Sequence, residues 1–339
     1  MSFLKNTWYL AAWSEEVGAT PLARTIADVP IALFRDESGA AAAVLDMCPH
    51  RFVPLSRGRV EDGVLVCGYH GLGFGRDGAC RRNPHGPIVS SLAVRAFPLV
   101  ERHAGLWLWL GDPAAADPAK IPDLSFIDQT PPESRASGYL VNTANYLLMV
   151  DNIMDLSHAD YLHPDTLGGG INTRTKGKVE EQGDRVTIRW HADNELLPPV
   201  QNAFLPEPGQ RADFRNEVTW HPPGVMVQRL AFGPTGRMAT EGADSLTVHA
   251  MTPESKDRTH YFFCHTSDAL RGNPGLTPQI RAVLLAAFGN EDSPMLAAQQ
   301  ERIGDADFWS LKPALLPIDT GAVQARRRMD RLIAEEQRA

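Results

Sequence analysis

The stretch Cys48-Pro49-His50, followed by Cys67-Gly68-Tyr69-His70, decides how the first part of this chain folds. Each segment carries one cysteine and one histidine, and sixteen residues separate His50 from Cys67. Two thiolates and two imidazoles on two loops can hold a [2Fe–2S] cluster, with both cysteines on one iron and both histidines on the other. The same side chains are also the ligand types of a zinc site.

The order of the ligands separates these two interpretations. A zinc finger with two cysteines and two histidines places both cysteines first, whereas here each loop supplies one of each. The mixed order C-x-H…C-x₂-H is that of a Rieske centre and favours the iron–sulfur cluster. The other two cysteines, Cys80 and Cys264, are expected to be ordinary reduced thiols, because four cysteines in 339 residues do not make a disulfide framework.

Length, charge and hydropathy limit the classes of protein. A chain of 339 residues is long enough for about two domains. The net charge of −8, with no basic and aromatic stripe, argues against a nucleic-acid partner. No apolar run approaches the roughly 20 residues that a membrane span needs, and the N-terminus lacks the features of a signal peptide. We therefore expect a cytoplasmic protein with no membrane partner.

The pattern of short apolar runs and turns predicts two domains of different kinds. The first, residues 1–118, is expected to be all-β, and its second half ends in a linker rich in Asp, Pro and Ala at 111–122. The second, residues 119–339, is expected to be an antiparallel sheet followed by helices, which makes the whole chain α+β. Predicted strands are 8–12, 30–35, 41–45, 64–66, 106–110, 139–146, 179–191, 216–221, 225–232, 245–251 and 259–265, and predicted helices are 147–158, 277–289, 292–303 and 321–338.

A second group of possible metal ligands lies between residues 151 and 163. On a continuous helix Asp151, Asp155 and His158 would be spaced i, i+4 and i+7 and would face the same side. His163 falls off that face unless the helix ends before Pro164. Two imidazoles with a carboxylate from elsewhere would form a facial triad that holds Fe(II) and leaves coordination positions open. The alternative is an amphipathic helix with a solvated polar face.

Together the two motifs resemble the oxygenase (α) component of the Rieske non-haem iron oxygenases, and the resemblance covers nearly the whole chain. The flanking sequence resembles in particular the short O-demethylases of the vanillate and dicamba type. The residues that carry this resemblance are Asn6–Tyr9, Cys48–Arg51, Gly68–Leu72, Val150–His158 and Thr252–Glu254. It implies a Rieske [2Fe–2S] domain followed by a helix-grip, START-like catalytic domain.

The resemblance also implies the metal ligands. In this family His158 and His163 would ligate a mononuclear Fe(II), and an aspartate late in the chain would complete the set. Asp292 matches that placement, because it follows Glu291 and precedes the helical run at 296–300. The alternative for Asp292 is an acid at a helix N-terminus that stabilises the helix dipole. The cluster ligands would be Cys48, His50, Cys67 and His70.

Two further residues, Asp155 and Asn152, are expected to be catalytic by the same resemblance. The carboxylate at the position of Asp155 bridges, by hydrogen bonds, a cluster histidine of one subunit and an iron-ligating histidine of its neighbour. By family position the cluster histidine would be His70. The resemblance also implies a head-to-tail homotrimer, because within one subunit the two metal centres would lie too far apart for efficient electron transfer.

The implied function is that of the terminal oxygenase of a monooxygenase system, which oxidises a small aromatic substrate with O₂. Electrons from NADH would arrive through a separate ferredoxin or reductase, because no G-x-G-x-x-G fingerprint follows a strand in this sequence. The expected reaction is O-demethylation of a methoxylated aromatic acid with release of formaldehyde. The alternatives are hydroxylation of an aromatic ring or methyl group at the same iron, or a Rieske electron carrier with an inactive second domain.

Three residues are candidates for substrate binding. Gln228 interrupts an apolar strand, and His249 lies in another strand, so either could point inward toward a substrate carboxylate or phenol. Each could equally face solvent on a half-exposed sheet. Val283 lies in the helix before Asp292, where dicamba-type enzymes carry an indole, so the substrate cannot be transferred by resemblance.

Overall fold

The computed structural model describes residues 3–338 and forms two compact units. One unit comprises Phe3–Asp123 together with Thr252–Ser255, and the other comprises the remaining described residues. Small sheets make up the first unit, whereas the second combines one large sheet with helices, which confirms the predicted α+β class. None of the helices within residues 3–338 has the length and apolar character needed to cross a membrane.

The first unit is built from three small antiparallel sheets. Their strand orders are β1-β10-β9, β2-β3-β4 and β5-β6-β7-β8. The strands are β1 (Trp8–Trp13), β2 (Leu22–Ile26), β3 (Val29–Arg35), β4 (Ala41–Leu45), β5 (Arg59–Glu61), β6 (Val64–Val66), β7 (Gly73–Phe74), β8 (Cys80–Arg82), β9 (Leu99–Arg102) and β10 (Gly105–Trp109). The strands predicted in this region are confirmed. Trp107 and Trp109 on β10 are fully buried.

The second unit contains one seven-stranded antiparallel sheet in the order β11-β17-β16-β15-β14-β13-β12. Its strands are β11 (Ala136–Asn142), β12 (Lys178–Gln182), β13 (Arg185–Glu195), β14 (Ala212–His221), β15 (Val225–Pro234), β16 (Ala243–Ser255) and β17 (Arg258–Ser267). Every second residue of β14 is buried, from Ala212 to Trp220, as expected for a sheet with one covered face.

The single strand predicted over residues 179–191 is wrong. The chain turns at Gly183, whose φ of +59° lies in the left-handed region, and Gln182 pairs with Arg185 across the turn. Strands β12 and β13 therefore form a hairpin with a two-residue loop, a position that favours glycine. The alternation of apolar residues is confined to β13, at Val186, Ile188 and Trp190, and it does not extend into β12.

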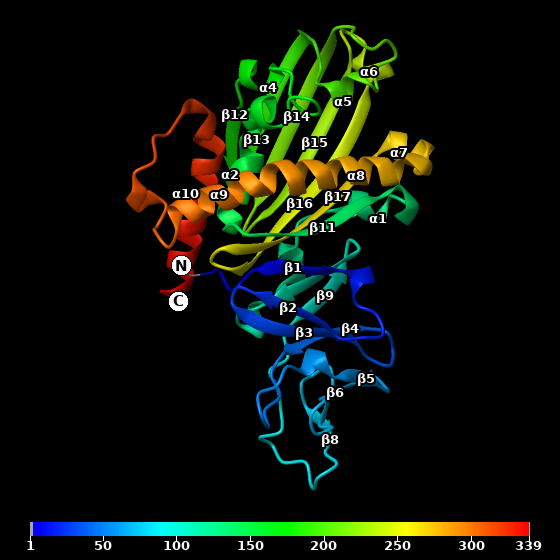
Figure 1. The fold of residues 1–339 in the computed structure, drawn as a ribbon, viewed down its shortest axis with the longest axis vertical. Helices are drawn as coiled ribbons and strands as arrows, with labels where there is room; N and C mark the ends of the chain where they lie inside the picture. Colours follow the sequence, from blue (N-terminus) through cyan, green and yellow to red (C-terminus); the bar gives the residue numbers. More distant parts are fainter. Residues whose placement is uncertain (1–2, 339) are drawn as a thin grey trace. The chain divides into compact units, whose positions relative to one another are not determined.

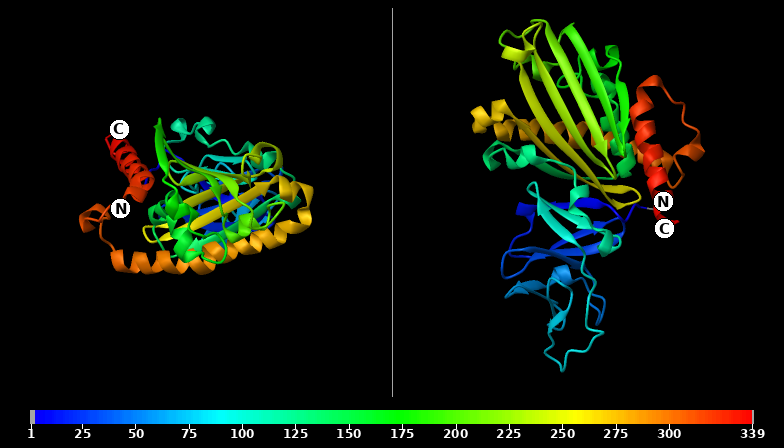
Figure 2. Two further views of the ribbon diagram at one scale, coloured as in Figure 1. Left: turned by 90° about the horizontal axis from the view of Figure 1, so that it is seen from above. Right: turned by 180° about the vertical axis from the view of Figure 1, so that it is seen from behind.

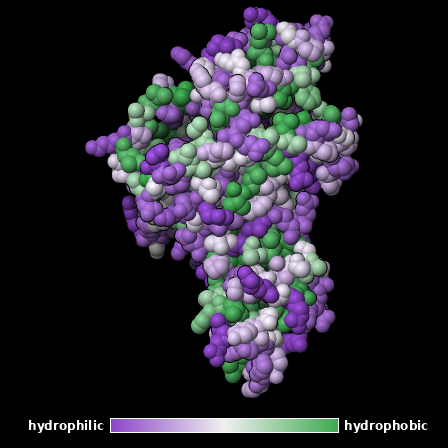
Figure 3. Space-filling model, viewed as in Figure 1, coloured by the Kyte–Doolittle hydropathy of each residue, from purple (hydrophilic) through white to green (hydrophobic). Residues whose placement is uncertain are grey.

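A long helical segment lies across one face of the sheet (Figure 1), and the view from behind shows the strands in front of it (Figure 2). It runs through α8 (Thr277–Ala286), a π-helix (Ala287–Asp292) and α9 (Ser293–Ile303). This is the helix-grip arrangement expected from the sequence. The other helices are α1 (Ser125–Asp128), α2 (Tyr146–Met154), α3 (Ala159–Leu162), α4 (Ile171–Arg174), α5 (Pro199–Asn202), α6 (Met238–Glu241), α7 (Asp268–Gly272) and α10 (Thr320–Glu336). On the face shown in Figure 3, hydrophobic residues form small patches between hydrophilic ones.

The continuous helix predicted over residues 147–158 is also wrong. Helix α2 ends at Met154, and Asp155 is extended, with φ −132° and ψ 100°. The Asp155 carboxylate accepts hydrogen bonds from the backbone N–H and the hydroxyl of Ser157, and this local cap replaces the helical bonds. Asp151 therefore does not share a face with Asp155 and His158.

Asp151 instead forms a buried ion pair that the sequence did not suggest. Its carboxylate lies 2.5 Å from the guanidinium of Arg326 on α10, and Arg326 is only 5% exposed. Burial raises the pKa of Asp151, and the nearby Arg326 offsets part of that rise. The pair holds α10 against α2, the helix that leads into the histidine segment.

Candidate metal centres and substrate cavity

The two Cys-His loops converge in the first unit. Cys48 and Cys67 are 2% and 1% exposed and belong to a hydrophobic cluster, whereas the rings of His50 and His70 lie nearer the surface with their centroids 4.5 Å apart. The second loop turns at Gly71, whose φ of +73° favours glycine and whose N–H donates to the carbonyl of Cys67. The structure thus groups the thiols in the interior and the imidazoles outside them.

This grouping fits a binuclear cluster better than one zinc ion. Among residues 3–338, the four donors do not form a set compact enough for a single metal ion, although zinc would require all four around one point. Separate pairs of thiols and imidazoles are what two irons of a Rieske cluster require. Burial raises the pKa of the Cys48 thiol, so its ligating thiolate form needs the charge of a metal to stabilise it.

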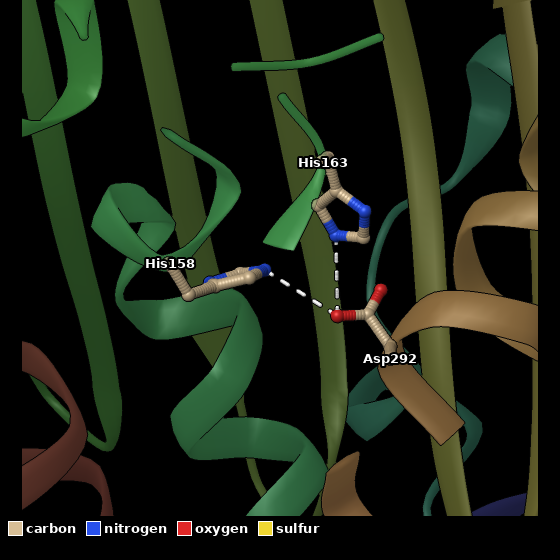
Figure 4. A group of neighbouring side chains, drawn as sticks. All are labelled: His158, His163 and Asp292. Atoms are coloured by element: carbon tan, nitrogen blue, oxygen red, sulfur yellow. Dashed lines mark ion pairs between the residues drawn. The ribbon is translucent and has the colours of Figure 1, made fainter. Parts of the chain in front are cut away.

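In the second unit, His158, His163 and Asp292 form one compact group, the iron triad (Figure 4). Their potential ligand atoms all lie within 4.8 Å of one another. Oδ1 of Asp292 is 3.5 Å from Nε2 of His158 and 3.2 Å from Nε2 of His163. His163 and Asp292 are 1% and 5% exposed. Two imidazole nitrogens and a carboxylate oxygen facing one point match the donor set of a facial Fe(II) triad.

Two breaks in regular helix bring these side chains together. After α2 the chain forms a 3₁₀ turn that ends at His158, and then the four-residue helix α3, so that His163 follows directly on the end of α3. The helix therefore ends before Pro164, as His163 required. Asp292 is the last residue of the π-helix, a feature frequent at functional sites. It has helical backbone angles, and its carboxylate caps no backbone N–H.

Hydrogen bonds hold both histidines with Nε2 toward Asp292. Nδ1 of His158 donates to the backbone carbonyl of Asp155 at 2.6 Å, and Nδ1 of His163 donates to Oε2 of Glu291 at 2.5 Å. Burial alone would lower the pKa of His163, but its hydrogen bonds to Asp292 and Glu291 outweigh that effect and raise it. Asn152 donates to Oδ1 of Asp292 at 3.1 Å. Carboxylate and carbonyl partners of this kind fix the tautomer of a ligating imidazole.

Glu291 was not among the residues assigned a role from the sequence. Consecutive acids before a helix are common, and only the π-helix turns both Glu291 and Asp292 toward His163. We predict that Glu291→Ala lowers iron affinity about 10–100-fold, the effect typical of losing such a partner. Glu291→Gln should lose less, because its amide oxygen still accepts from Nδ1 of His163. Iron competition against a chelator measures this, and an unchanged affinity in Glu291→Ala would contradict it.

The iron triad lines a cavity of about 220 Å³ between α8 and the sheet. Most of the cavity wall is apolar and includes Leu230, Val283 and Phe288. All three candidate substrate-binding residues, Gln228, His249 and Val283, line it. Gln228 and His249 thus face the cavity, and the solvent-facing alternative does not apply.

A chain of hydrogen bonds crosses four neighbouring strands at the cavity wall. The Tyr261 hydroxyl donates to Nδ1 of His249, and Nε2 of His249 donates to Oε1 of Gln228, at 2.7 and 3.2 Å. The Gln228 amide then donates to Oδ1 of Asn216 at 3.1 Å. Burial lowers the pKa of His249 to about 3, so the imidazole is neutral at physiological pH. Asn216 and Tyr261 were not predicted from the sequence, since neither interrupts a recognisable pattern.

Because of the buried histidines of the cavity, we predict that the folded protein loses stability in acid. His249 and His265 have pKa values lowered by burial to about 3 and 4, against about 6.5 in the unfolded chain. Between these values the unfolded state binds more protons, so stability falls as the pH drops from about 7.5 to 5. The expected loss is about 2 kcal/mol for each histidine. Urea unfolding at both pH values measures it. His265→Gln should reduce this difference by about 2 kcal/mol, and an identical pH dependence in wild type and variant would contradict the assignment.

Comparison with known proteins agrees with both centres. The Rieske [2Fe-2S] domain family matches residues 7–97, and the vanillate O-demethylase oxygenase C-terminal domain family matches residues 142–335. The oxygenase component of dicamba O-demethylase from Stenotrophomonas maltophilia is 36% identical, with 98% of each chain covered. The vanillate O-demethylase oxygenase subunit of a Pseudomonas species is 34% identical, over 99% of this chain and 97% of that one. The crystal structure of dicamba monooxygenase bound to dicamba superimposes over the full length of both chains with a TM-score of 0.93 and 35% identity.

The chain therefore belongs to the Rieske non-haem iron oxygenases. Within that family it is an oxygenase component, an enzyme that carries a [2Fe–2S] cluster and a mononuclear iron and works with a separate electron-transfer partner. This confirms the family resemblance and both cofactors expected from the sequence. It also rules out the alternative that the Cys-His loops bind a zinc ion.

Proposed function

We propose that this chain catalyses O-demethylation of a methoxylated aromatic compound in the cytoplasm. NADH supplies the electrons through a ferredoxin or reductase. The observation that carries the proposal is the iron triad opening onto an apolar cavity with room for one substituted benzene ring. The reaction type is supported by two relatives, a dicamba O-demethylase and a vanillate O-demethylase, whose similarity covers almost the entire chain.

The residues of the cavity have distinct parts in this reaction. His158, His163 and Asp292 hold the iron, which when bound supplies the O₂ chemistry of facial-triad oxygenases. Apolar side chains such as Val283 and Phe288 exclude water and hold the ring with its methoxy group toward the iron triad. Oxidation of the methyl carbon yields a hemiacetal, which releases formaldehyde and leaves a phenol.

Asp155 is proposed to carry electrons between subunits of a homotrimer. Its backbone carbonyl accepts from His158, so the residue is already coupled to an iron ligand. Each carboxylate oxygen accepts one hydrogen bond from Ser157, which leaves lone pairs for a further donor. We propose that His70 of a neighbouring subunit is that donor. Light scattering on the intact protein checks the trimer.

The proposed reaction is tested by product analysis. The purified enzyme is supplied with NADH, a surrogate reductase and a panel of methoxylated aromatics, and formaldehyde, phenol and O₂ consumption are measured together. One formaldehyde per phenol supports O-demethylation. Ring-hydroxylated or hydroxymethyl products without formaldehyde would establish hydroxylation instead, and an intact iron site without any turnover would favour an electron carrier.

A further inference from the structure

His265 on β17 lines the cavity but does not belong to the iron triad. We infer that His265 is a specificity residue whose ring, held in place by Thr247, binds a hydroxyl group on the aromatic substrate. The inference rests on the proposed function, because it takes this cavity as the substrate site. It adds to the methoxy group a second ring substituent that the enzyme recognises.

The alternation of β17 directs His265 into the cavity. Phe263 packs against Phe288 of the π-helix, with ring centroids 5.2 Å apart, so this side of β17 faces the helical segment. His265 lies two residues further along and therefore has the same orientation. Thr247, on the cavity face of β16, also lines the cavity. Together they form a polar position in a wall that is mostly apolar.

One ring nitrogen of His265 is bonded, and the other is open. Nδ1 lies 2.8 Å from the hydroxyl oxygen of Thr247, whereas Nε2 has no hydrogen-bond partner within residues 3–338. In His249, by contrast, both nitrogens are bonded, one to Tyr261 and one to Gln228. Of the two cavity histidines outside the iron triad, His265 is therefore the one that keeps a ring nitrogen for a ligand.

A hydroxyl group matches this nitrogen in either tautomer of the imidazole. Burial lowers the pKa of His265 to about 4, so the ring is neutral near pH 7 and has one N–H and one acceptor nitrogen. The Thr247 hydroxyl can donate to Nδ1, which makes Nε2 the donor, or accept from it, which makes Nε2 the acceptor. A phenolic hydroxyl both donates and accepts, and it therefore pairs with Nε2 in both cases.

The strands indicate where on the ring this hydroxyl lies. Burial lowers the pKa of both histidines, but the charge of Asp292 acts in addition on His249 and not on His265. His249 is thus the nearer of the two to the iron triad. Thr247 is two residues away from His249, about 7 Å along β16. A ring with its methoxy group at the iron triad therefore brings a substituent on its far side toward His265.

This position distinguishes substrates by the cost of an unpaired polar atom. A ring without the hydroxyl displaces water from Nε2 of His265 and leaves that nitrogen without a hydrogen bond. A hydroxyl at the same place restores the bond. Sites built to bind a substrate hydroxyl discriminate against the analogue that lacks it, and we expect about a tenfold difference in affinity here.

Matched pairs of methoxylated aromatics test the inference, because the members of each pair differ only in a hydroxyl on the side of the ring opposite the methoxy group. Binding to the iron-loaded enzyme is measured by calorimetry at pH 7.5, without reductant. We expect at least one hydroxylated compound to bind about tenfold more tightly than its partner. Equal or weaker binding of every hydroxylated compound, or no binding of any pair, would overturn the inference.

Two variants assign the preference to this position. His265→Leu removes the ring nitrogens and should bring the members of a pair to within about twofold of each other. Thr247→Val removes only the hydroxyl that holds the ring and should reduce the preference. His191→Ala, which removes an exposed histidine on β13, is the matched control and should keep it.

A full preference in His265→Leu would overturn the role of His265, and an unchanged preference in Thr247→Val would overturn that of Thr247. Iron content and cluster absorption show whether each variant is folded, and the wild-type comparison stands without them.

The outcome is separable from that of the proposed reaction. Formaldehyde release with the same kcat/KM from both members of every pair would overturn the role of His265 and leave O-demethylation intact. Selective binding of hydroxylated compounds without formaldehyde release would support the role of His265 and contradict O-demethylation.

Discussion

Replacing His158 with alanine should abolish turnover while leaving the visible absorption of the [2Fe–2S] cluster unchanged. His158 supplies one of only two imidazoles in the iron triad, and its Nε2 lies 3.5 Å from Asp292. The loss should exceed the roughly 10–100-fold effect expected for an outer partner such as Glu291. Because the cluster loops belong to the first unit, iron content should fall from about three to about two atoms per chain.

Three measurements define this result: turnover with NADH and O₂, the visible spectrum, and iron together with acid-labile sulfide. His191→Ala, which removes an exposed histidine on β13, is the matched control and should keep full activity and iron. Surviving activity in His158→Ala would show that the mononuclear site is assigned to the wrong residues. Zinc without sulfide in the wild-type protein would contradict the entire scheme.

Replacing Asp155 with asparagine should block electron transfer to the mononuclear iron while leaving both metal centres assembled. An asparagine oxygen can still accept from the N–H of Ser157, so the local cap and the position of His158 should persist. The negative charge and the second carboxylate oxygen are lost, and with them the proposed bridge to His70 of a neighbour. We expect NADH-driven product formation to fall by about 100-fold.

Stopped-flow reduction distinguishes this from a structural defect. The reductase should reduce the cluster of Asp155→Asn at the wild-type rate, but the reduced cluster should then persist in the presence of substrate and O₂. Asp165→Asn changes an exposed acid in the same segment and should behave as wild type. Full turnover in Asp155→Asn, or loss of iron like that of His158→Ala, would remove Asp155 from the electron path.

Much of the fold follows from local patterns. Strand β14 alternates between a covered and an exposed face, so its apolar period is visible in the sequence. Helix α10 has a similarly clear period. The wrong predictions lie where a single residue ends a strand or a helix, at Gly183 and at Asp155. At Asp155 apolar residues lie on both sides of the break, so the apolar pattern carries no signal of it, whereas at Gly183 the local signal is the turn pair Gly183-Asp184.

The sequence by itself determined the kinds of metal centre in this protein. Ligand chemistry depends on residue type and short spacing, and the order of Cys48, His50, Cys67 and His70 already excludes a common zinc-finger arrangement. The segment from 151 to 163 likewise indicated a second metal site. Its carboxylate ligand lies more than a hundred residues away, and only the resemblance pointed to Asp292.

Only the tertiary structure decided how the iron triad is held and what the cavity can bind. The π-helix before α9 turns Glu291 and Asp292 onto opposite nitrogens of His163, and such a bulge depends on packing rather than on local preference. The cavity joins residues from β14 to β17 with α8, so its polarity depends on which side chains burial leaves neutral. Burial and charge balance are properties of the assembled fold, and no stretch of the sequence expresses them alone.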